Sequence, residues 1–194
     1  SEYLKDFQIN SDALSSVYRV NAKYNQAVES KEDVSRNVNW KLKKFEWSNL
    51  FNYGKDNSVD FKNINGITGI FGKNFSGKSS IIDAILFTIF NTTSKNERKN
   101  ANVVNQNRNC GEGKVTISVN EKVFTIHRKV EKYEKKSKGE TSIEAKTHLD
   151  FSMYNTVTEE TKSLNGNTRN QTDANIRKQF GTIEDFLISS MSSQ

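Results

Sequence analysis

The chain of 194 residues contains no proline, one cysteine (Cys110) and no long hydrophobic segment. A lone cysteine excludes an internal disulfide and a cysteine-based metal cluster, and it fits a reducing compartment. No apolar run approaches the roughly 20 residues that a membrane-spanning helix needs, and no signal peptide opens the chain. These absences predict a soluble, cytoplasmic protein without a membrane partner.

The composition is that of a folded chain, because 34% of the residues are hydrophobic and 27% are charged. The length fits one domain with room for an appendage. The formal net charge of +6 permits contact with DNA without establishing it. Together with 24 asparagines and no proline, the lysine excess also fits an AT-rich coding genome.

One stretch, GKNFSGKSS at residues 72–80, organises the rest of the sequence. Gly72, Gly77, Lys78 and Ser79 match the P-loop pattern G-x-x-x-x-G-K-[ST]. The apolar run 67–71 before it predicts a buried strand, and the apolar run 81–90 after it predicts a buried helix. A chance match in a Gly/Ser turn is the alternative, but strand, glycine loop and helix form the context that the motif requires.

The spacing of the motif suits a triphosphate. Backbone N–H groups at a helix N-terminus bind anions, and Gly72 and Gly77 let the backbone bend around phosphates without a Cβ in the way. Lys78 is expected to reach the β and γ phosphates. The hydroxyl of Ser79 is expected to bind Mg²⁺, and Ser80 to donate near the α phosphate. The sequence therefore predicts binding of ATP and Mg²⁺.

The remaining pattern predicts the other elements. A leader at residues 1–38 holds a helix over 12–28, followed by a linker; it packs on the domain or pairs with a coiled coil or partner. Strands are expected at 40–47, 58–61, 115–119, 123–130 and 145–153, and helices at 172–179, capped by Thr172, and 184–190, with a capping box from Thr182 to Asp185. Residues 91–113 are expected at the surface. The lysine-rich run 129–141 is either a solvated loop or a patch for DNA phosphates.

An element needed for hydrolysis is missing from this pattern. Hydrolysis needs a carboxylate that holds Mg²⁺ and a group that orients water. No strand of four apolar residues ends in an acidic residue. Either Asp83 or Asp150 does this work, or the carboxylates lie on polypeptide outside this chain.

From Trp47 onward, the motifs resemble those of the N-terminal lobe of an ABC-type ATPase of the SbcC class, the SMC-like ATPases of double-strand-break repair in cells and phages. The resemblance covers residues 40–194. It rests on segments that occur in the family's order: WSNLFNYG at 47–54, the P-loop with SSIIDAI at 79–85, VVN at 103–105, LNG at 164–166 and FLISSMSSQ at 186–194.

The resemblance implies an α/β fold in which residues 39–194 form an N-terminal lobe with a mixed central sheet and antiparallel hairpins. It implies that Asn74 and the loop amides fix the γ phosphate, and that Gln194 contacts Mg²⁺ and the attacking water. Two residues depart from the family: Phe75 stands where glycine is usual, and Phe51 where many members have a basic residue. The full set of expected nucleotide contacts is Gly72, Asn74, Phe75, Ser76, Gly77, Lys78, Ser79 and Ser80, with Lys78 and Gln194 in catalytic roles.

The expected partners also come from the resemblance. The first is the protein's own C-terminal lobe, which follows a coiled coil and carries the signature motif and the Walker B glutamate. The others are a second ATPase head that dimerises on ATP, a nuclease subunit and double-stranded DNA. The expected setting is a bacterial or phage-infected cell. The completed protein is then an ATPase, whereas this chain alone is not expected to turn ATP over. The alternatives are an ATPase of the RecF, RecN or SMC kind, and an independent P-loop binding module or kinase.

Overall fold

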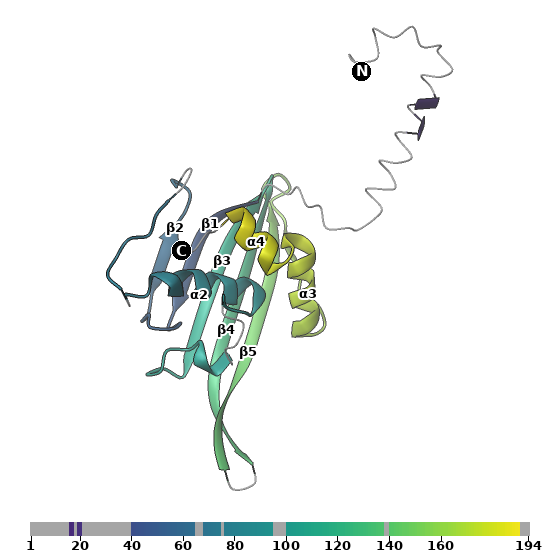
Figure 1. Ribbon diagram of the computed structural model, residues 1–194. Coiled ribbons are helices and arrows are strands. Elements are labelled where there is room, and N and C mark those ends of the chain that lie inside the picture. The colour runs from purple at the N-terminus through teal and green to yellow at the C-terminus, as the bar shows by residue number, and fades with distance from the viewer. Residues whose placement is uncertain are drawn as a thin grey trace. The chain divides into compact units, whose positions relative to one another are not determined.

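The structure is a computed structural model that describes residues 16–17, 19–20, 40–64, 68–74, 76–94, 100–137 and 140–190, with residues 187–190 as backbone only. The chain divides into two units, Ser1–Ser35 and Arg36–Gln194. The leader helix expected over 12–28 lies mostly outside the described residues; the four described there are helical. A domain boundary at residue 38 stays a prediction. All features that follow belong to the second unit (Figure 1).

A six-stranded sheet forms the framework of this unit, with the strand order β2-β1-β3-β4-β5-β6. Every pairing between these strands is antiparallel. The α/β class is confirmed, but the described sheet has no parallel pair, so the expectation of a mixed central sheet is wrong for this part of the chain. The strands are β1 (Trp40–Ser48), β2 (Asn57–Asp60), β3 (Cys110–Val119), β4 (Lys122–Ser137), β5 (Glu140–Asn155) and β6 (Thr161–Ser163).

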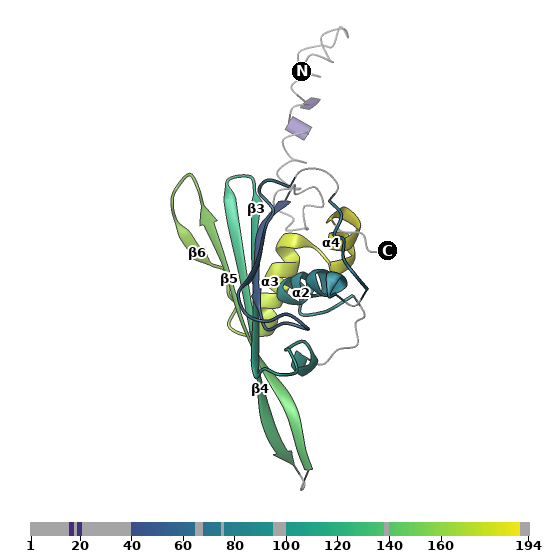
Figure 2. The same cartoon turned by 90° about the vertical axis from the view of Figure 1, so that its left-hand side faces the viewer.

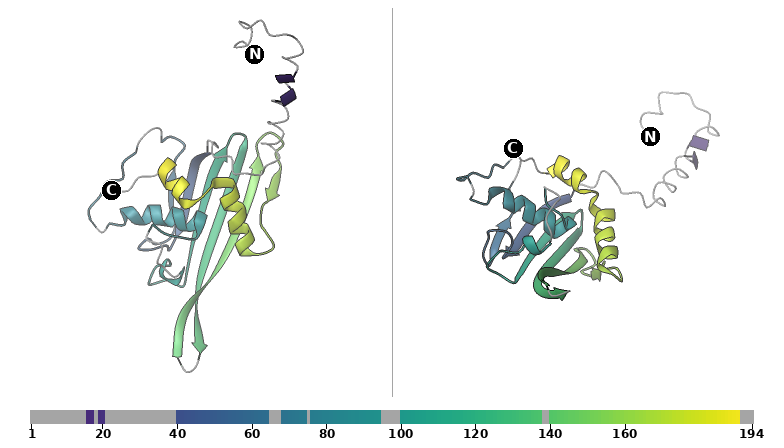
Figure 3. Two further views of the ribbon diagram at one scale, coloured as in Figure 1. Left: turned by 45° about the vertical axis from the view of Figure 1, so that its right-hand side comes forward. Right: turned by 60° about the horizontal axis from the view of Figure 1, so that its bottom comes forward.

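The two faces of the sheet differ because side chains alternate along a strand. Val115 pairs with Ile126 and Ile117 pairs with Phe124, and all four side chains are buried. Three helices cover this face: α2 (Lys78–Phe90), α3 (Arg169–Phe180) and α4 (Ile183–Ser190) (Figures 2 and 3). Within the described ranges, no helix covers the opposite face, which carries charged side chains.

Helix α2 confirms the prediction from the apolar run 81–90. Its last seven residues, 84–90, are all buried, because the sheet lies on one side of the helix and α3 and α4 flank it. Gly113 of β3 allows a close approach, since a Cβ there would collide with the Thr88 hydroxyl. None of the described helices is long and apolar enough to cross a membrane.

Helices α3 and α4 lie close to their predicted positions, with one correction. The cap of α3 is Thr168 rather than Thr172, and Thr168 and Gln171 form a capping box. The hydroxyl of Thr172, in the first turn, instead accepts a hydrogen bond from the Gly166 amide at 2.9 Å. The capping box predicted for α4 is confirmed, since Asp185 N donates to Thr182 Oγ1 at 3.2 Å and Thr182 N donates to Asp185 Oδ2 at 3.0 Å.

The buried strand predicted at 67–71 is wrong for its described part, residues 68–71, which form no strand. Ile70 is 51% exposed and Phe71 is 93% exposed. A strand requires a neighbour for its backbone hydrogen bonds, and apolar side chains require a surface to pack on. The described residues supply neither at this position.

The described residues of the lysine-rich run 129–141, which are 129–137 and 140–141, form a two-stranded ribbon from β4 and β5 rather than a loop. β4 continues to Ser137, and from Lys132 to Ser137 it pairs only with β5. The ribbon projects beyond the rest of the sheet (Figures 1 and 2). Lys135 Nζ lies 2.9 Å from Glu144 Oε1 across it. Residues 91–113 also differ from expectation, because Val103 and Val104 are buried and Val104 forms a bridge with Leu50.

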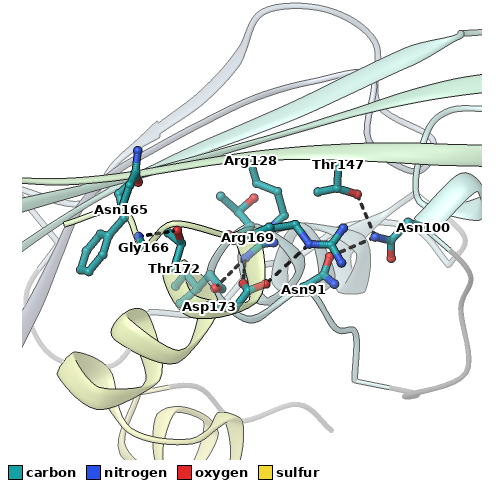
Figure 4. Close-up of polar contacts among 12 residues, drawn as sticks. Asn91, Asn100, Arg128, Thr147, Asn165, Gly166, Arg169, Thr172 and Asp173 are labelled. Atoms are coloured by element: carbon teal, nitrogen blue, oxygen red, sulfur yellow. Dashed lines mark hydrogen bonds and ion pairs between the residues drawn. The ribbon is translucent and has the colours of Figure 1, made fainter. Parts of the chain in front are cut away.

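A buried arginine joins three elements beneath the C-terminal end of α2 (Figure 4). Arg128 of β4 is fully buried, and its guanidinium donates to the carbonyls of Thr88 at 3.0 Å and Ile89 at 3.2 Å. It also pairs with Asp173 of α3 at 2.6 Å. Burial lowers the pKa of Arg128, an effect that Asp173 opposes. The cation therefore satisfies helix carbonyls that have no partner within α2.

Candidate functional site

The phosphate-loop motif lies at the other end of α2, where the chain enters the helix. Gly77 is the N-cap residue and has φ 91° and ψ 13°, a left-handed conformation that glycine adopts without strain. No side chain caps this end, and the first turn contains no acidic residue. The amide groups and the positive end of the helix dipole are therefore available to an anion.

Lys78 folds back over the loop. Its Nζ donates to the carbonyl oxygens of Gly72 and Lys73, both at 2.7 Å. A Cβ on Gly72 would lie 3.0 Å from Ser76 Oγ, so glycine keeps the inside of the turn open. The ammonium group therefore lies against the backbone of the loop, where the motif predicts that phosphates bind.

The other predicted ligands are distributed along the same turn. Ser76 N donates to Lys73 O at 3.2 Å, and Ser80 N donates to Gly77 O at 3.0 Å. Asn74 and Ser79 are exposed. Phe75 and Gln194 lie outside the described residues. The geometry brings together Gly72, Asn74, Ser76, Gly77, Lys78, Ser79 and Ser80, and their individual roles stay predictions.

An open cleft of about 520 Å³ lies beside the start of α2. Its walls combine the aromatic side chain of Phe51 with several amide side chains. Phe51 has φ 52° and belongs to the turn that follows β1. The lining residues are Phe51, Asn52, Ser80, Asn102, Val104, Asn105, Gln106 and Asn107.

A contact between this turn and the loop was not predicted from the sequence. The Tyr53 hydroxyl donates to the carbonyl of Gly77 at 3.0 Å. The side chain of Asn52 lies against Gly77 as well, since a Cβ there would be 2.7 Å from Asn52 Nδ2. Both residues belong to the motif 47–54 that carries the family resemblance, which was the only signal of their importance.

Two carboxylates named as candidates for hydrolysis have other partners. Asp83 Oδ1 accepts a hydrogen bond from Ser94 N at 2.8 Å. Asp150 is exposed, pairs in register with His127 and accepts from Asn165 Nδ2 at 3.3 Å. No group of three or more His, Cys, Asp or Glu residues suited to a metal ion occurs among the described residues. Among the described residues, a metal at the loop would be held by Ser79 together with the ligand's own phosphates.

Comparison with known proteins agrees with this geometry. A family model described as an AAA domain matches residues 44–194. The chain is 28% identical over 176 residues to an uncharacterized protein, R555, of Acanthamoeba polyphaga mimivirus, a match that covers 87% of this chain and 12% of that protein. It is 30% identical over 111 residues to the DNA double-strand break repair Rad50 ATPase of Sulfolobus acidocaldarius, covering 57% of this chain and 11% of that one. The chain thus spans only a small part of these relatives.

A solved structure has the same fold. It comes from work on the structural biochemistry of ATP-driven dimerization and DNA-stimulated activation of SMC ATPases, and it aligns with a TM-score of 0.50 and 18% identity. The alignment covers 79% of this chain and 86% of the solved chain. Because this family model spans more than half of its length, the chain belongs to the AAA domain family.

Proposed function

We propose that this chain is the ATP-binding portion of an SMC-like ATPase of DNA double-strand-break repair. The observation that carries the proposal is the loop at residues 72–80, with Lys78 folded across it at an uncapped helix N-terminus. This arrangement combines backbone donors, a dipole and a cation for the same anion.

The residues of the loop fit a triphosphate with Mg²⁺. The two carbonyl oxygens that now accept from Lys78 are neutral, so phosphate oxygens would replace them as stronger partners for the ammonium group. The hydroxyl of Ser79 would hold Mg²⁺, which neutralises phosphate charge when bound. Asn74 and the loop amides would fix the γ phosphate. Gln194 would contact Mg²⁺ and the attacking water.

The cleft beside α2 fits the nucleoside. Phe51 offers an aromatic surface for a purine base, and the amide side chains of Asn52 and Asn105 can donate and accept hydrogen bonds. Ser80 joins the cleft to the phosphate loop, since it lines the cleft and opens α2. Phe51, which replaces a basic residue of the family, would then contribute stacking in place of charge.

Hydrolysis would require further polypeptide. Asp83 and Asp150 have partners elsewhere, and Ile70 and Phe71 present apolar surface beside the loop. A C-terminal lobe of the same protein would cover this surface, pair with residues 68–71 and bring the Walker B carboxylate. A second head would face the loop with its signature motif. ATP binding would clamp the two heads together, and hydrolysis would release them.

The printed names of the relatives support a DNA partner, whereas a nuclease partner is suggested by the family resemblance alone. The archaeal relative is named for double-strand break repair, and the solved structure for DNA-stimulated activation. We infer that the clamp holds duplex DNA on basic surface and gates an associated nuclease subunit. The net charge of +6 supports the contact with phosphates.

Titration of the 194-residue chain with MgATP tests the proposal. We expect weak binding, which Lys78→Ala reduces about 10- to 100-fold because a charge-assisted contact with phosphate is lost. Lys122→Ala, on the exposed first residue of β4, is the matched control and should bind as the wild type does. Equal binding by wild type and Lys78→Ala would contradict the role of the loop. Rapid ATP hydrolysis by this chain alone would contradict the need for a second lobe.

A further inference from the structure

Among the described residues, Tyr53 lies outside the motif and contacts the phosphate loop through a polar atom. It lies in the turn after β1, and its hydroxyl donates to the carbonyl of Gly77 at 3.0 Å. The ring is half-buried and packs edge-on against Trp47, with centroids 5.2 Å apart and an interplanar angle of 82°. Burial raises the pKa of Tyr53, so the hydroxyl keeps its proton and remains a donor.

The turn that carries Tyr53 is firmly held. Asn105 Nδ2 donates to the carbonyl of Tyr53 at 3.1 Å, and Asn105 N donates to the carbonyl of Asn49 at 2.9 Å. The amide of Phe51 donates to Val103 O at 2.7 Å. The turn that carries Tyr53 is therefore held in place by hydrogen bonds to the segment around Val104.

The peptide that Tyr53 contacts follows a glycine, Gly77. Gly77 has φ 91° and lacks a Cβ, so its ψ is less restricted than that of other residues. A trans peptide is planar, and its C=O and N–H point in opposite directions. A bond that fixes the carbonyl of Gly77 therefore also fixes the direction of the amide N–H of Lys78.

We propose that Tyr53 is a positioning residue for the phosphate loop: its hydroxyl holds the Gly77–Lys78 peptide so that the Lys78 amide faces the ligand. This inference rests on the proposed binding of ATP at the loop. Preorganised donors bind an anion more tightly because they lose less freedom on binding. Ser80 N also donates to Gly77 O, so loss of the hydroxyl leaves this carbonyl paired and the fold intact.

The test compares Tyr53→Phe with Tyr133→Phe in the 194-residue chain. Tyr133 is a matched control, because its hydroxyl also donates a hydrogen bond, to Glu144 Oε2 at 2.8 Å, on the projecting ribbon. We expect Tyr53→Phe to weaken binding of MgATP and of inorganic tripolyphosphate by the same factor, about fivefold, since one hydrogen bond is lost. The urea midpoint of Tyr53→Phe should stay at the wild-type value, and Tyr133→Phe should bind both ligands as the wild type does.

Each alternative result has a distinct meaning. Unchanged affinity for both ligands would overturn the role of Tyr53. A loss for ATP that spares tripolyphosphate would also overturn it, because the residue would then act through the nucleoside. If the wild-type chain binds neither ligand, the proposed function itself fails.

A second measurement does not depend on affinity. In the ligand-free chain, amide NMR spectra should show a shift of the Lys78 resonance on Tyr53→Phe, while resonances of residues 84–90 stay in place. Shifts spread along the whole of α2 would indicate a general packing role and would overturn the assignment.

Discussion

The two ends of α2 differ in what surrounds them. At the C-terminal end, residues 84–90 are all buried, and the side chain of Arg128 satisfies the carbonyls of Thr88 and Ile89. At the N-terminal end, Gly77 has no side-chain cap, and Phe71 nearby is 93% exposed. The C-terminal end is buried and two of its carbonyls are paired, whereas the N-terminal end leaves amide donors uncapped and an aromatic side chain exposed.

The C-terminal end of α2 therefore supports the fold, and the N-terminal end forms the candidate binding site. Buried packing and a paired cation fix the helix in place, so the loop at its other end can remain open without loss of the fold. The open end has the features that a ligand and a covering polypeptide would use. Mutations at the two ends should therefore have different consequences, for stability at one end and for binding at the other.

The largest effect is expected at the closed end. Arg128→Ala leaves Asp173 and two helix carbonyls without their buried partner, and we expect it to lower the free energy of unfolding by about 3–5 kcal/mol. Urea denaturation of the chain measures this value. Arg108→Ala, on an exposed residue, should change the value by less than about 0.5 kcal/mol. Similar midpoints for the two variants would show that the closed end does not depend on Arg128.

A smaller effect is expected at the loop. Gly77→Ala forces a left-handed conformation on a residue with a Cβ, at a cost of about 1–2 kcal/mol, and brings the Cβ against the side chain of Asn52. We expect weaker binding of MgATP in titrations, beyond the loss of stability. Gly54→Ala is the control, because a Cβ there meets nothing within 4 Å. Binding equal to that of Gly54→Ala would mean that the loop does not need this glycine.

The smallest effect is expected at Phe71. Phe71→Ser removes an aromatic ring that water already surrounds, so the stability of this chain should change by less than about 0.5 kcal/mol. Phe87→Ala, one of the buried residues of α2, should cost about 3–5 kcal/mol in the same denaturation experiment. A loss above about 1 kcal/mol for Phe71→Ser would place Phe71 in a packed contact and weaken the contrast between the two ends.

The sequence predicted those parts of the fold that local pattern determines. Alternation identified β1, β3 and the first half of β4, and the apolar run identified α2. Residues 68–71 have an apolar, β-branched pattern, but a strand also depends on a neighbour that the described residues do not provide. The part of the ribbon at residues 133–137 and 140–143 was missed because its side chains are exposed on both faces, so no apolar alternation marks it as strand.

The candidate site also has one part that the local sequence predicts and one part that depends on tertiary packing. The phosphate loop is local, and its motif residues Gly72, Gly77, Lys78 and Ser79 were predicted from their spacing alone. The contact between Tyr53 and Gly77 joins residues 24 positions apart, and Asn105 joins the same cluster from another segment. Such contacts depend on how β1 and α2 pack, which no local pattern encodes.

Amide hydrogen exchange of the 194-residue chain, with and without MgATP, tests the contrast between the ends of α2 most directly. Without ligand, we expect slow exchange at residues 84–90, which are buried within α2, and fast exchange at 72–80, whose described residues are exposed or only partly buried. MgATP should slow exchange at 72–80 and leave 84–90 unchanged. Exchange at 72–80 that does not respond to saturating MgATP would contradict the account.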